Sequence, residues 1–493
     1  MSSVLVTPAP VLTDDGPAIV ELHRLHTLQR AAFLSDPLPT ASQRSENLAA
    51  LAGMIVARRN EIRAAMAEDF AVHPDVFTDL VEVLGVAGRA AHAMEHLDGW
   101  MAEEERFADP ALFGSARASI RYQPKGVIGN IVPWNFPFDL SVGPLVEMLA
   151  AGNRAIIKPS DYTPACAELL ARMVAEAFPE DLVAVSVGGL ALAKEFPTLR
   201  WDHLLYTGSP AIGREVALAA AENLVPVTLE LGGKCPAIMT TGSVTAENVR
   251  SVIGTKLIKN GQMCISVDYT LVPRADVDAF VGHAEEMFAS DLAGYASSAD
   301  CTGIITQRHL ERIESMLDEA RAAGVRIVRL GGNGNRGSRQ LPLSLVIDPP
   351  DGLRIMHEEI FGPILPVVAY DDLDDAVATI NAGERPLGLY VYSSDEGVAE
   401  RVLAQTTSGG ACINVCALQG ALPALGFGGV GHSGTGRHHG VDGFREFSNP
   451  RGVVVRGTGD LADAFLPPYG PLAQAVVEGA FAAASNHHAV DGR

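Results

Sequence analysis

Apolar residues in the first hundred positions recur every three or four residues, and this spacing predicts amphipathic helices. One such face runs through Leu48, Leu51, Ile55 and Ile62, with charged residues between them. From Arg121 onward the pattern changes, and short apolar runs alternate with longer helical segments. Strand–helix alternation of this kind predicts parallel sheets covered by helices, and therefore an α/β fold.

The expected elements can be placed from this alternation. The strands are 126–132, 155–157, 182–187, 203–206, 225–231 and 236–239, and the helices between and after them are 141–151, 165–178, 214–223 and 245–259. Gly261 follows the last of these helices and is expected to end it. A second α/β region then continues to about Gly410.

Length and charge narrow the class of protein. A chain of 493 residues exceeds the size at which a single core stops growing, so two or three domains are expected. A formal net charge of -22 argues against general electrostatic binding to nucleic acid or to an anionic membrane surface. A local basic pocket could still hold a phosphate group.

Cysteine usage and the chain's start predict a cytoplasmic protein. The six scattered cysteines indicate reduced thiols rather than a disulfide framework. Cys412 and Cys416 have no adjacent Cys or His to complete a zinc site, so no metal is expected. Residues Met1–Pro10 lack a basic stretch followed by an apolar core, which predicts no secretory signal. The uncharged stretch 407–431 is rich in glycine and suits a loop better than a membrane span.

Two segments carry a candidate nucleophile and a candidate base. Cys264 follows a predicted helix and a glycine, in a turn that can present a thiol to a cleft; taken alone it would be read as buried filler. Glu230 lies between two leucines at a predicted strand end. Partial burial there would raise its pKa toward neutrality and suit a general base, whereas an ordinary edge carboxylate is the alternative.

Two further loops follow predicted strands. In the segment 133–137 (PWNFP), Asn135 holds an amide in an apolar setting, where it could stabilise an oxyanion or simply cap the turn. The segment 207–213 (TGSPAIG) leads from a strand into a helix, whose free N–H groups could bind phosphate. It is not the usual Gly-x-Gly-x-x-Gly fingerprint, so this pattern is weak by itself.

Together these segments resemble the aldehyde dehydrogenase family over nearly the whole chain and in the right order. The segments 158–160 (KPS), 358–363 (EEIFGP) and 426–429 (GFGG) agree with it, and Ile265 with Asp268 and Tyr269 favours the class 3 and coniferyl aldehyde dehydrogenase branch. The resemblance implies a Rossmann-type NAD(P)-binding domain over 1–105 and 125–232, an α/β catalytic domain over 233–430, and small bridging strands at 106–124 and 444–456.

The resemblance also implies a reaction, in which an aldehyde is oxidised to the carboxylic acid with NAD(P)+. Cys264 would attack the aldehyde carbon, and the Asn135 amide with the Cys264 N–H would hold the oxyanion. Glu230 would activate the water that hydrolyses the thioester. The residues implied to contact the cofactor are Trp134, Lys158, Ser160, Asp161, Gly208, Ser209, Gly213, Glu359 and Phe361.

Departures from the family bear on the cofactor and the substrate. Asp161 stands where the family commonly has glutamate; an acid there favours NAD, and NADP use stays open. Gly426 replaces a usual proline before the aromatic residue of that turn. An aromatic or medium-chain aldehyde is expected rather than a charged semialdehyde, because the residues of the predicted pocket are apolar: Phe136, Met263, Ile265 and Phe427. Trp134 and Phe138 lie nearby in the sequence, and each of these aromatic residues could equally be core packing.

The remaining expectations concern the oligomeric state and two alternative functions. The bridging strands imply a homodimer or homotetramer, and the pair His438-His439 is expected to be exposed. One alternative function is a CoA-acylating aldehyde or semialdehyde dehydrogenase, which Glu230 argues against because such relatives lack that base. The other is a retired binding protein of the same fold, against which all three catalytic side chains are present.

Overall fold

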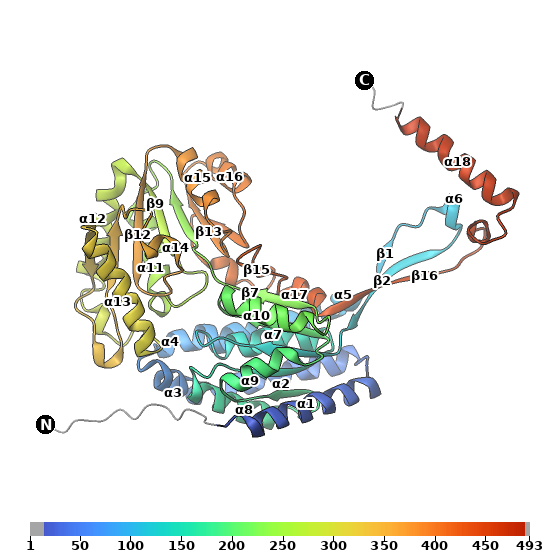
Figure 1. Ribbon diagram of the computed structural model, residues 1–493, viewed down its shortest axis with the longest axis horizontal. Coiled ribbons are helices and arrows are strands. Elements are labelled where there is room, and N and C mark those ends of the chain that lie inside the picture. Colours follow the sequence, from blue (N-terminus) through green and yellow to red (C-terminus); the bar gives the residue numbers. More distant parts are fainter. Residues whose placement is uncertain (1–13, 489–493) are drawn as a thin grey trace. The chain divides into compact units, whose positions relative to one another are not determined.

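The computed structural model describes residues 14–488, with side chains described for residues 14–484. The chain divides into two compact units (Figure 1). The larger unit contains Pro124–Ser448 together with the chain up to Trp100, and the smaller contains Met101–Gln123 and the chain from Asn449 onward. The prediction about a secretory signal in Met1–Pro10 falls outside the described residues.

The first sheet of the larger unit has the strand order of a doubly wound fold. It consists of β3 (Val127–Ile131), β4 (Arg154–Lys158), β5 (Val183–Val185), β6 (His203–Thr207), β7 (Val227–Glu230) and β15 (Gly434–Thr435). Its order is β15-β7-β6-β3-β4-β5, with every pair parallel except β15 with β7. The order reverses between β3 and β6, and ligands of such sheets bind at the carboxyl ends of the strands at this point.

Helices connect these strands and cover the sheet (Figure 1). The connecting helices are α7 (Asp139–Ala150), α8 (Pro164–Ala177), α9 (Leu190–Glu195), η2 (Phe196–Thr198) and α10 (Pro210–Ala221). The segment before β3 is helical, as its periodicity predicts, with α1 (Gly16–Ser35), α2 (Ala41–Ala57), α3 (Arg59–Phe70), α4 (Asp75–Phe77), the π-helix η1 (Thr78–Gly85) and α5 (Val86–Met101). Leu22 of α1 packs with Ile156, Trp201 and Leu204 in one buried core cluster.

The second sheet is also largely parallel. It consists of β8 (Pro236–Met239), β9 (Tyr269–Pro273), β10 (Arg326–Leu330), β11 (Leu343–Ile347), β12 (Ile364–Tyr370), β13 (Gly388–Tyr392) and β14 (Gly410–Ile413). Its order is β10-β11-β12-β9-β8-β13-β14, and only β10 is antiparallel to its neighbour. Two parallel sheets surrounded by helices confirm the predicted α/β fold.

The remaining helical elements of the larger unit follow β8 in the chain. They are α11 (Ala246–Leu257), η3 (Ile258–Gly261), η4 (Arg274–Asp276), α12 (Val277–Ser290), η5 (Tyr295–Ser297), α13 (Gln307–Ala322), η6 (Arg336–Ser338), α14 (Arg354–His357), α15 (Leu373–Ala382), α16 (Glu396–Gln405), η7 (Leu418–Gly420) and α17 (Gly440–Glu446). Within the described residues, no helix is both long and apolar enough to cross a membrane.

The smaller unit is built around a three-stranded sheet. Its elements are β1 (Glu104–Arg106), α6 (Pro110–Phe113), β2 (Arg117–Pro124), β16 (Ser448–Val455), η8 (Ala462–Phe465) and α18 (Pro471–His488). The strand order is β1-β2-β16, with β1 antiparallel to β2. The predicted strand at 444–456 is wrong at its start, because Phe444 lies in α17. Phe444 and Phe447 are both buried, and their spacing of three residues is that of one helical face.

Two other local predictions are wrong. Helix α11 ends at Leu257, and Gly261 lies in the following turn η3 with a φ of +81°. A Cβ at Gly261 would collide with the carbonyl oxygen of Gly362, so this glycine permits a close approach of two loops rather than ending the helix. The pair His438-His439 is buried rather than exposed, because both rings pack beside Phe427.

Candidate active site

A cavity of about 260 Å³ lies inside the larger unit, between loops of its two sheets. The first sheet contributes residues at the carboxyl ends of its strands: Asn135 after β3, Gly208 after β6 and Glu230 at the end of β7. Cys264 and Glu359 come from the segments that precede β9 and β12 of the second sheet. The three predicted catalytic residues therefore line one cavity at the switch point of the doubly wound sheet.

Cys264 is half-buried, and burial favours the neutral form of its thiol. Desolvation raises the pKa of Cys264 to about 12, and the nearby carboxyl groups of Glu359 and Glu230 add to this shift. A thiol in this state is a weak nucleophile until a base removes its proton. The site must therefore supply a proton acceptor when the thiol attacks.

The raised pKa makes a direct prediction about alkylation. We expect the rate at which iodoacetamide alkylates Cys264 to rise about tenfold for each pH unit between pH 7 and pH 10, because only the thiolate reacts and its fraction grows in that proportion well below the pKa. The rate would be measured by mass spectrometry of the peptide that contains Cys264. A plateau near neutral pH would instead show a low-pKa thiol and contradict the prediction.

Glu230 is the buried carboxyl group of the cavity. Its side chain is 2 % exposed, and neither carboxyl oxygen has a hydrogen-bond partner among the described residues. Burial raises the pKa of Glu230 well above its ordinary value, and Arg437 opposes this shift only in part. A carboxyl group that is desolvated, unpartnered and exposed only to a cavity has the properties of a general base.

Asn135 is buried and fixed from both sides. Its side-chain Nδ2 donates to the backbone oxygen of Gln262 at 3.3 Å, and its own backbone oxygen accepts a hydrogen bond from the Lys259 ammonium. Gln262 lies two residues before Cys264, so this contact joins the amide directly to the loop that carries the thiol. The amide and the thiol thus reach the cavity from two loops that are bonded to each other.

The segment that carries Glu359 is held by two basic residues. Lys234 donates to Asp268 and to the backbone oxygens of Ile355 (2.7 Å) and Glu358 (3.1 Å). Arg312 donates to the backbone oxygen of Glu359 at 3.3 Å. Burial raises the pKa of Glu359 to about 8, mainly through desolvation and then through the charge of Asp268.

Comparison with known proteins agrees with this geometry. The profile described as "Aldehyde dehydrogenase family" matches residues 29–453. The chain belongs to the aldehyde dehydrogenase family. It is 43% identical over 450 residues to the probable coniferyl aldehyde dehydrogenase of Caulobacter vibrioides, a match that covers 90% of this chain and 93% of the relative. The aldehyde dehydrogenase is thus an oxidoreductase of the coniferyl-like, class 3 branch, as its motifs predict.

Solved structures of other aldehyde dehydrogenases have the same fold. The substrate-bound Staphylococcus aureus AldH superposes with a TM-score of 0.86 at 32% identity, over 93% of this chain and 99% of that one. The Mycobacterium tuberculosis aldehyde dehydrogenase, solved in complex with NAD+, superposes with a TM-score of 0.79 at 28% identity, over 89% of this chain and 90% of that one.

The residues of this aldehyde dehydrogenase fit a dinucleotide on structural grounds. Helix α10 begins directly after Ser209, and no side chain caps its first N–H groups, which leaves them free for a phosphate. Lys158 is buried at the end of β4, where its Nζ donates to the backbone oxygen of Pro159 at 3.1 Å. Glu359 offers a carboxyl group for ribose hydroxyls. Gly232 lacks the Cβ that would collide with this carboxyl group.

The predicted residues divide into those that line the cavity and those that do not. Eight line it: Trp134, Asn135, Gly208, Ser209, Glu230, Cys264, Glu359 and Phe361. Ser160 and Asp161 follow Lys158, and Ser160 is buried while Asp161 is exposed. Gly213 belongs to α10 and lies close to the side chain of Leu231. Lys158, Ser160, Asp161 and Gly213 do not line the cavity, and neither do the predicted substrate-pocket residues.

The four residues predicted to line a substrate pocket are not among the residues that line this cavity. Phe136 is buried with its ring centroid 4.3 Å from the Lys259 ammonium. Met263 is buried beside the nucleophile. Ile265 and Phe427 both lie against Gly420, whose missing side chain leaves room for them. Half-buried Phe427 also packs on the rings of His438 and His439 at 5.4 and 5.5 Å.

Sequence analysis missed two residues of the cavity wall, His309 and Arg312. Both come from α13. The ring of His309 makes an edge contact with Trp134 at 5.4 Å, and Trp134 makes another with Phe361 at 5.3 Å. No motif marks the two α13 residues, because their spacing of three shows only that they share a helix face and not what that face meets.

Proposed function

We propose that this aldehyde dehydrogenase oxidises an aldehyde to the carboxylic acid with NAD+ or NADP+, through a covalent adduct on Cys264. The observation that carries the proposal is the convergence in one cavity of a thiol, an unpartnered buried carboxyl group and an amide bonded to the nucleophile loop. These are the groups that acyl chemistry requires: a nucleophile, a general base and an oxyanion donor.

The chain's own residues divide the reaction into two halves. In the first half, the sulfur of Cys264 bonds to the aldehyde carbon, its proton passes to solvent water, and the carbonyl electron pair moves onto oxygen. The Asn135 amide and the Cys264 backbone N–H stabilise that oxyanion. The dinucleotide, when bound, supplies the oxidising power by accepting a hydride, which leaves the substrate as a thioester of Cys264.

In the second half, the thioester is hydrolysed. Glu230, as the carboxylate, takes a proton from a water molecule as the water oxygen attacks the thioester carbon. The carbon–sulfur bond then breaks, the acid leaves, and the thiol of Cys264 is restored. A CoA-acylating reaction would need no such base, and Glu230 is therefore evidence for hydrolysis over transfer to coenzyme A.

The charges around Lys158 favour NAD+ over NADP+. Burial lowers the pKa of Lys158, while Asp161 and Asp15 oppose this shift, so two carboxylates act on the same ammonium. If Lys158 and Asp161 hold the adenosine ribose with Ser160 nearby, these acids repel a 2′-phosphate. Trp134, Gly208, Ser209, Gly213, Glu359 and Phe361 would complete the cofactor contacts.

The proposed substrate is an aromatic, coniferyl-type aldehyde or a medium-chain aldehyde. The rings of Trp134, His309 and Phe361 form one wall of the cavity, and they suit an apolar or aromatic group better than a charged one. The Caulobacter relative is named for coniferyl aldehyde. Four apolar residues do not line this cavity and would shape the path of the substrate at a greater distance from it: Phe136, Met263, Ile265 and Phe427.

The proposed division of labour follows the sheets. Residues 1–105 and 125–232 would hold the dinucleotide and residues 233–430 would supply the nucleophile. The segments 106–124 and 444–456 would bridge two subunits, because β1 and β16 form the two edges of their three-stranded sheet and such edges can pair with another strand. A homodimer or homotetramer is the expected assembly.

We expect turnover of coniferyl aldehyde, benzaldehyde or octanal to exceed that of succinic semialdehyde, with kcat/KM at least about tenfold higher for NAD+ than for NADP+, since about 1.4 kcal/mol of repulsion suffices for that ratio. The measurement is reduction of each cofactor followed at 340 nm, with the acid identified by chromatography in the absence of coenzyme A. Strict dependence on coenzyme A, or fastest turnover of the semialdehyde, would contradict the proposal.

A further inference from the structure

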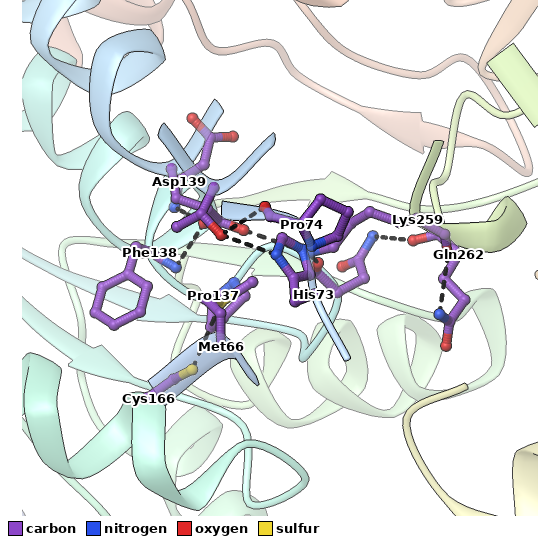
Figure 2. A network of polar contacts seen from close by, with 12 residues as sticks. Met66, His73, Pro74, Pro137, Phe138, Asp139, Cys166, Lys259 and Gln262 are labelled. Carbon is purple, nitrogen blue, oxygen red and sulfur yellow. Dashed lines mark hydrogen bonds and ion pairs between the residues drawn. The ribbon is translucent and has the colours of Figure 1, made fainter. Parts of the chain in front are cut away.

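A buried ion pair joins Lys259, labelled in Figure 2, to Glu82, and it contacts the loop that carries Asn135. Lys259 of η3 and Glu82 of η1 approach with Nζ and Oε1 3.3 Å apart, and both side chains have no exposed surface. Neither lines the cavity, so neither can touch a substrate there. A charge buried this deeply is costly unless its partner and its hydrogen bonds are in place, which makes the pair a rigid point in the structure.

The Lys259 ammonium reaches the backbone of the oxyanion donor. Besides its ion pair, it donates a hydrogen bond to the backbone oxygen of Asn135. The rings of Phe70 and Phe136 lie against it, with centroids 4.6 and 4.3 Å from Nζ. The ammonium is thus surrounded by two aromatic rings, the Glu82 carboxylate and the backbone oxygen of Asn135.

Glu82 fixes the other end of the same loop. Its Oε2 accepts hydrogen bonds from the backbone N–H groups of Phe138 (3.0 Å) and Asp139 (2.8 Å), where α7 begins. Figure 2 shows these two residues and Lys259 joined through one connected set of polar contacts. The segment from 135 to 139 is therefore held at its start by Lys259 and at its end by Glu82.

The backbone of Lys259 also supports the nucleophile loop. Lys259 and Asn260 adopt φ values of +48° and +55°, which residues other than glycine rarely adopt without support. The Lys259 oxygen accepts from the Gln262 side chain at 2.9 Å and from its backbone N–H at 3.2 Å. The backbone oxygen of Gln262 in turn accepts a hydrogen bond from the Asn135 side-chain amide, and Cys264 follows two residues later.

We propose that Lys259 and Glu82 are positioning residues that hold the Asn135 amide in register with Cys264. The inference rests on the proposed function, in which this amide stabilises the oxyanion. Oxyanion donors act within a narrow distance of the reacting oxygen, and a displacement of about 1 Å can cost about 10²-fold in rate. Because the pair contacts no substrate, its loss should lower kcat and leave KM for the aldehyde unchanged.

Two variants separate positioning from simple stabilisation. Lys259→Met keeps the length of the side chain but leaves Glu82 buried without its partner, so it also tests stability. Lys259→Met combined with Glu82→Gln removes both charges of the pair, so neither is left buried without its partner. We expect kcat to fall about 10²-fold in both variants, with KM within about threefold of the wild type, while thermal stability recovers only in the double variant.

Arg44→Met is the matched control. Arg44 is another buried cation, and it donates to the backbone oxygens of Ala150 (2.8 Å) and Pro39 (3.0 Å) rather than to either catalytic loop. Its loss should lower the melting temperature and leave kcat unchanged. A folded double variant with wild-type kcat, or an Arg44→Met variant with an equal loss of kcat, would overturn the inference.

A second readout is independent of turnover. Hydrogen–deuterium exchange of the backbone amides in 135–140, measured on the substrate-free protein, should accelerate in the double variant and stay unchanged in Arg44→Met. Unchanged exchange in the double variant overturns the inference. A wild type that oxidises no aldehyde with either cofactor overturns the proposed function instead, and the exchange experiment still decides whether the pair holds the loop.

Discussion

Replacing Cys264 with alanine is expected to abolish aldehyde oxidation, with kcat/KM falling by at least about 10⁴-fold. Removal of a covalent nucleophile leaves only the acceleration that binding and the oxyanion donors provide, and losses of this size follow in other enzymes that act through a covalent adduct. Cofactor reduction followed at 340 nm under saturating aldehyde would measure the loss, and the dissociation constant for NAD+ should change little.

Cys301→Ala is the control for this variant. Cys301 is a buried thiol that donates to the backbone oxygen of Leu341 at 3.9 Å, and it does not line the cavity. Its removal should cost stability through the small void it leaves, with kcat/KM close to the wild type. Full activity in Cys264→Ala would show that another group is the nucleophile.

Glu230→Gln is expected to slow thioester hydrolysis by about 10²–10⁴-fold while the first half of the reaction still produces a burst of reduced cofactor. The substitution keeps the shape of a side chain whose two oxygens have no partner among the described residues, so the fold should tolerate it. Rapid-mixing experiments with absorbance at 340 nm would separate the burst from the slow steady state. The loss of both phases would place Glu230 in the attack step instead.

The direction in which the hydrolysis rate changes with pH can be compared between the wild type and Glu230→Gln. Burial raises the pKa of Glu230, and a general base acts only as the carboxylate. Hydrolysis by the wild type should therefore increase as pH rises through this elevated pKa, and the increase should be absent in Glu230→Gln. A rate that falls with rising pH would mean that the protonated form is the active one.

Local patterns predicted the sheets of this protein well. The run at 236–239 is a strand with those bounds, and the neighbouring runs around 155–157 and 203–206 are strands that extend by a residue or two. Periodicity reports which face of a segment is buried, and a short apolar run bounded by turn residues has few conformations that bury it. Glu230 was identified by the same reasoning, since the leucines on both sides of it already indicated burial.

Other features have no local signal. His438 and His439 are polar in sequence but are enclosed beside Phe427, and burial lowers the pKa of both well below the ordinary value, which leaves the rings neutral. Phe444 was predicted at the start of a strand, yet it lies in α17, where it is buried at helical spacing from Phe447. In both cases the surrounding chain determines the outcome.

The sequence by itself determined the α/β class and the family, and it predicted a thiol, a carboxyl group and an amide that line one cavity, because these depend on local periodicity and on motifs of adjacent residues. Only the tertiary structure decided that His309 and Arg312 join the cavity and that Glu82 pairs with Lys259, across 177 positions of the chain. Such contacts form when the packing of helices and sheets brings distant segments together. A charge that becomes buried in this way is stable only if an oppositely charged group lies beside it.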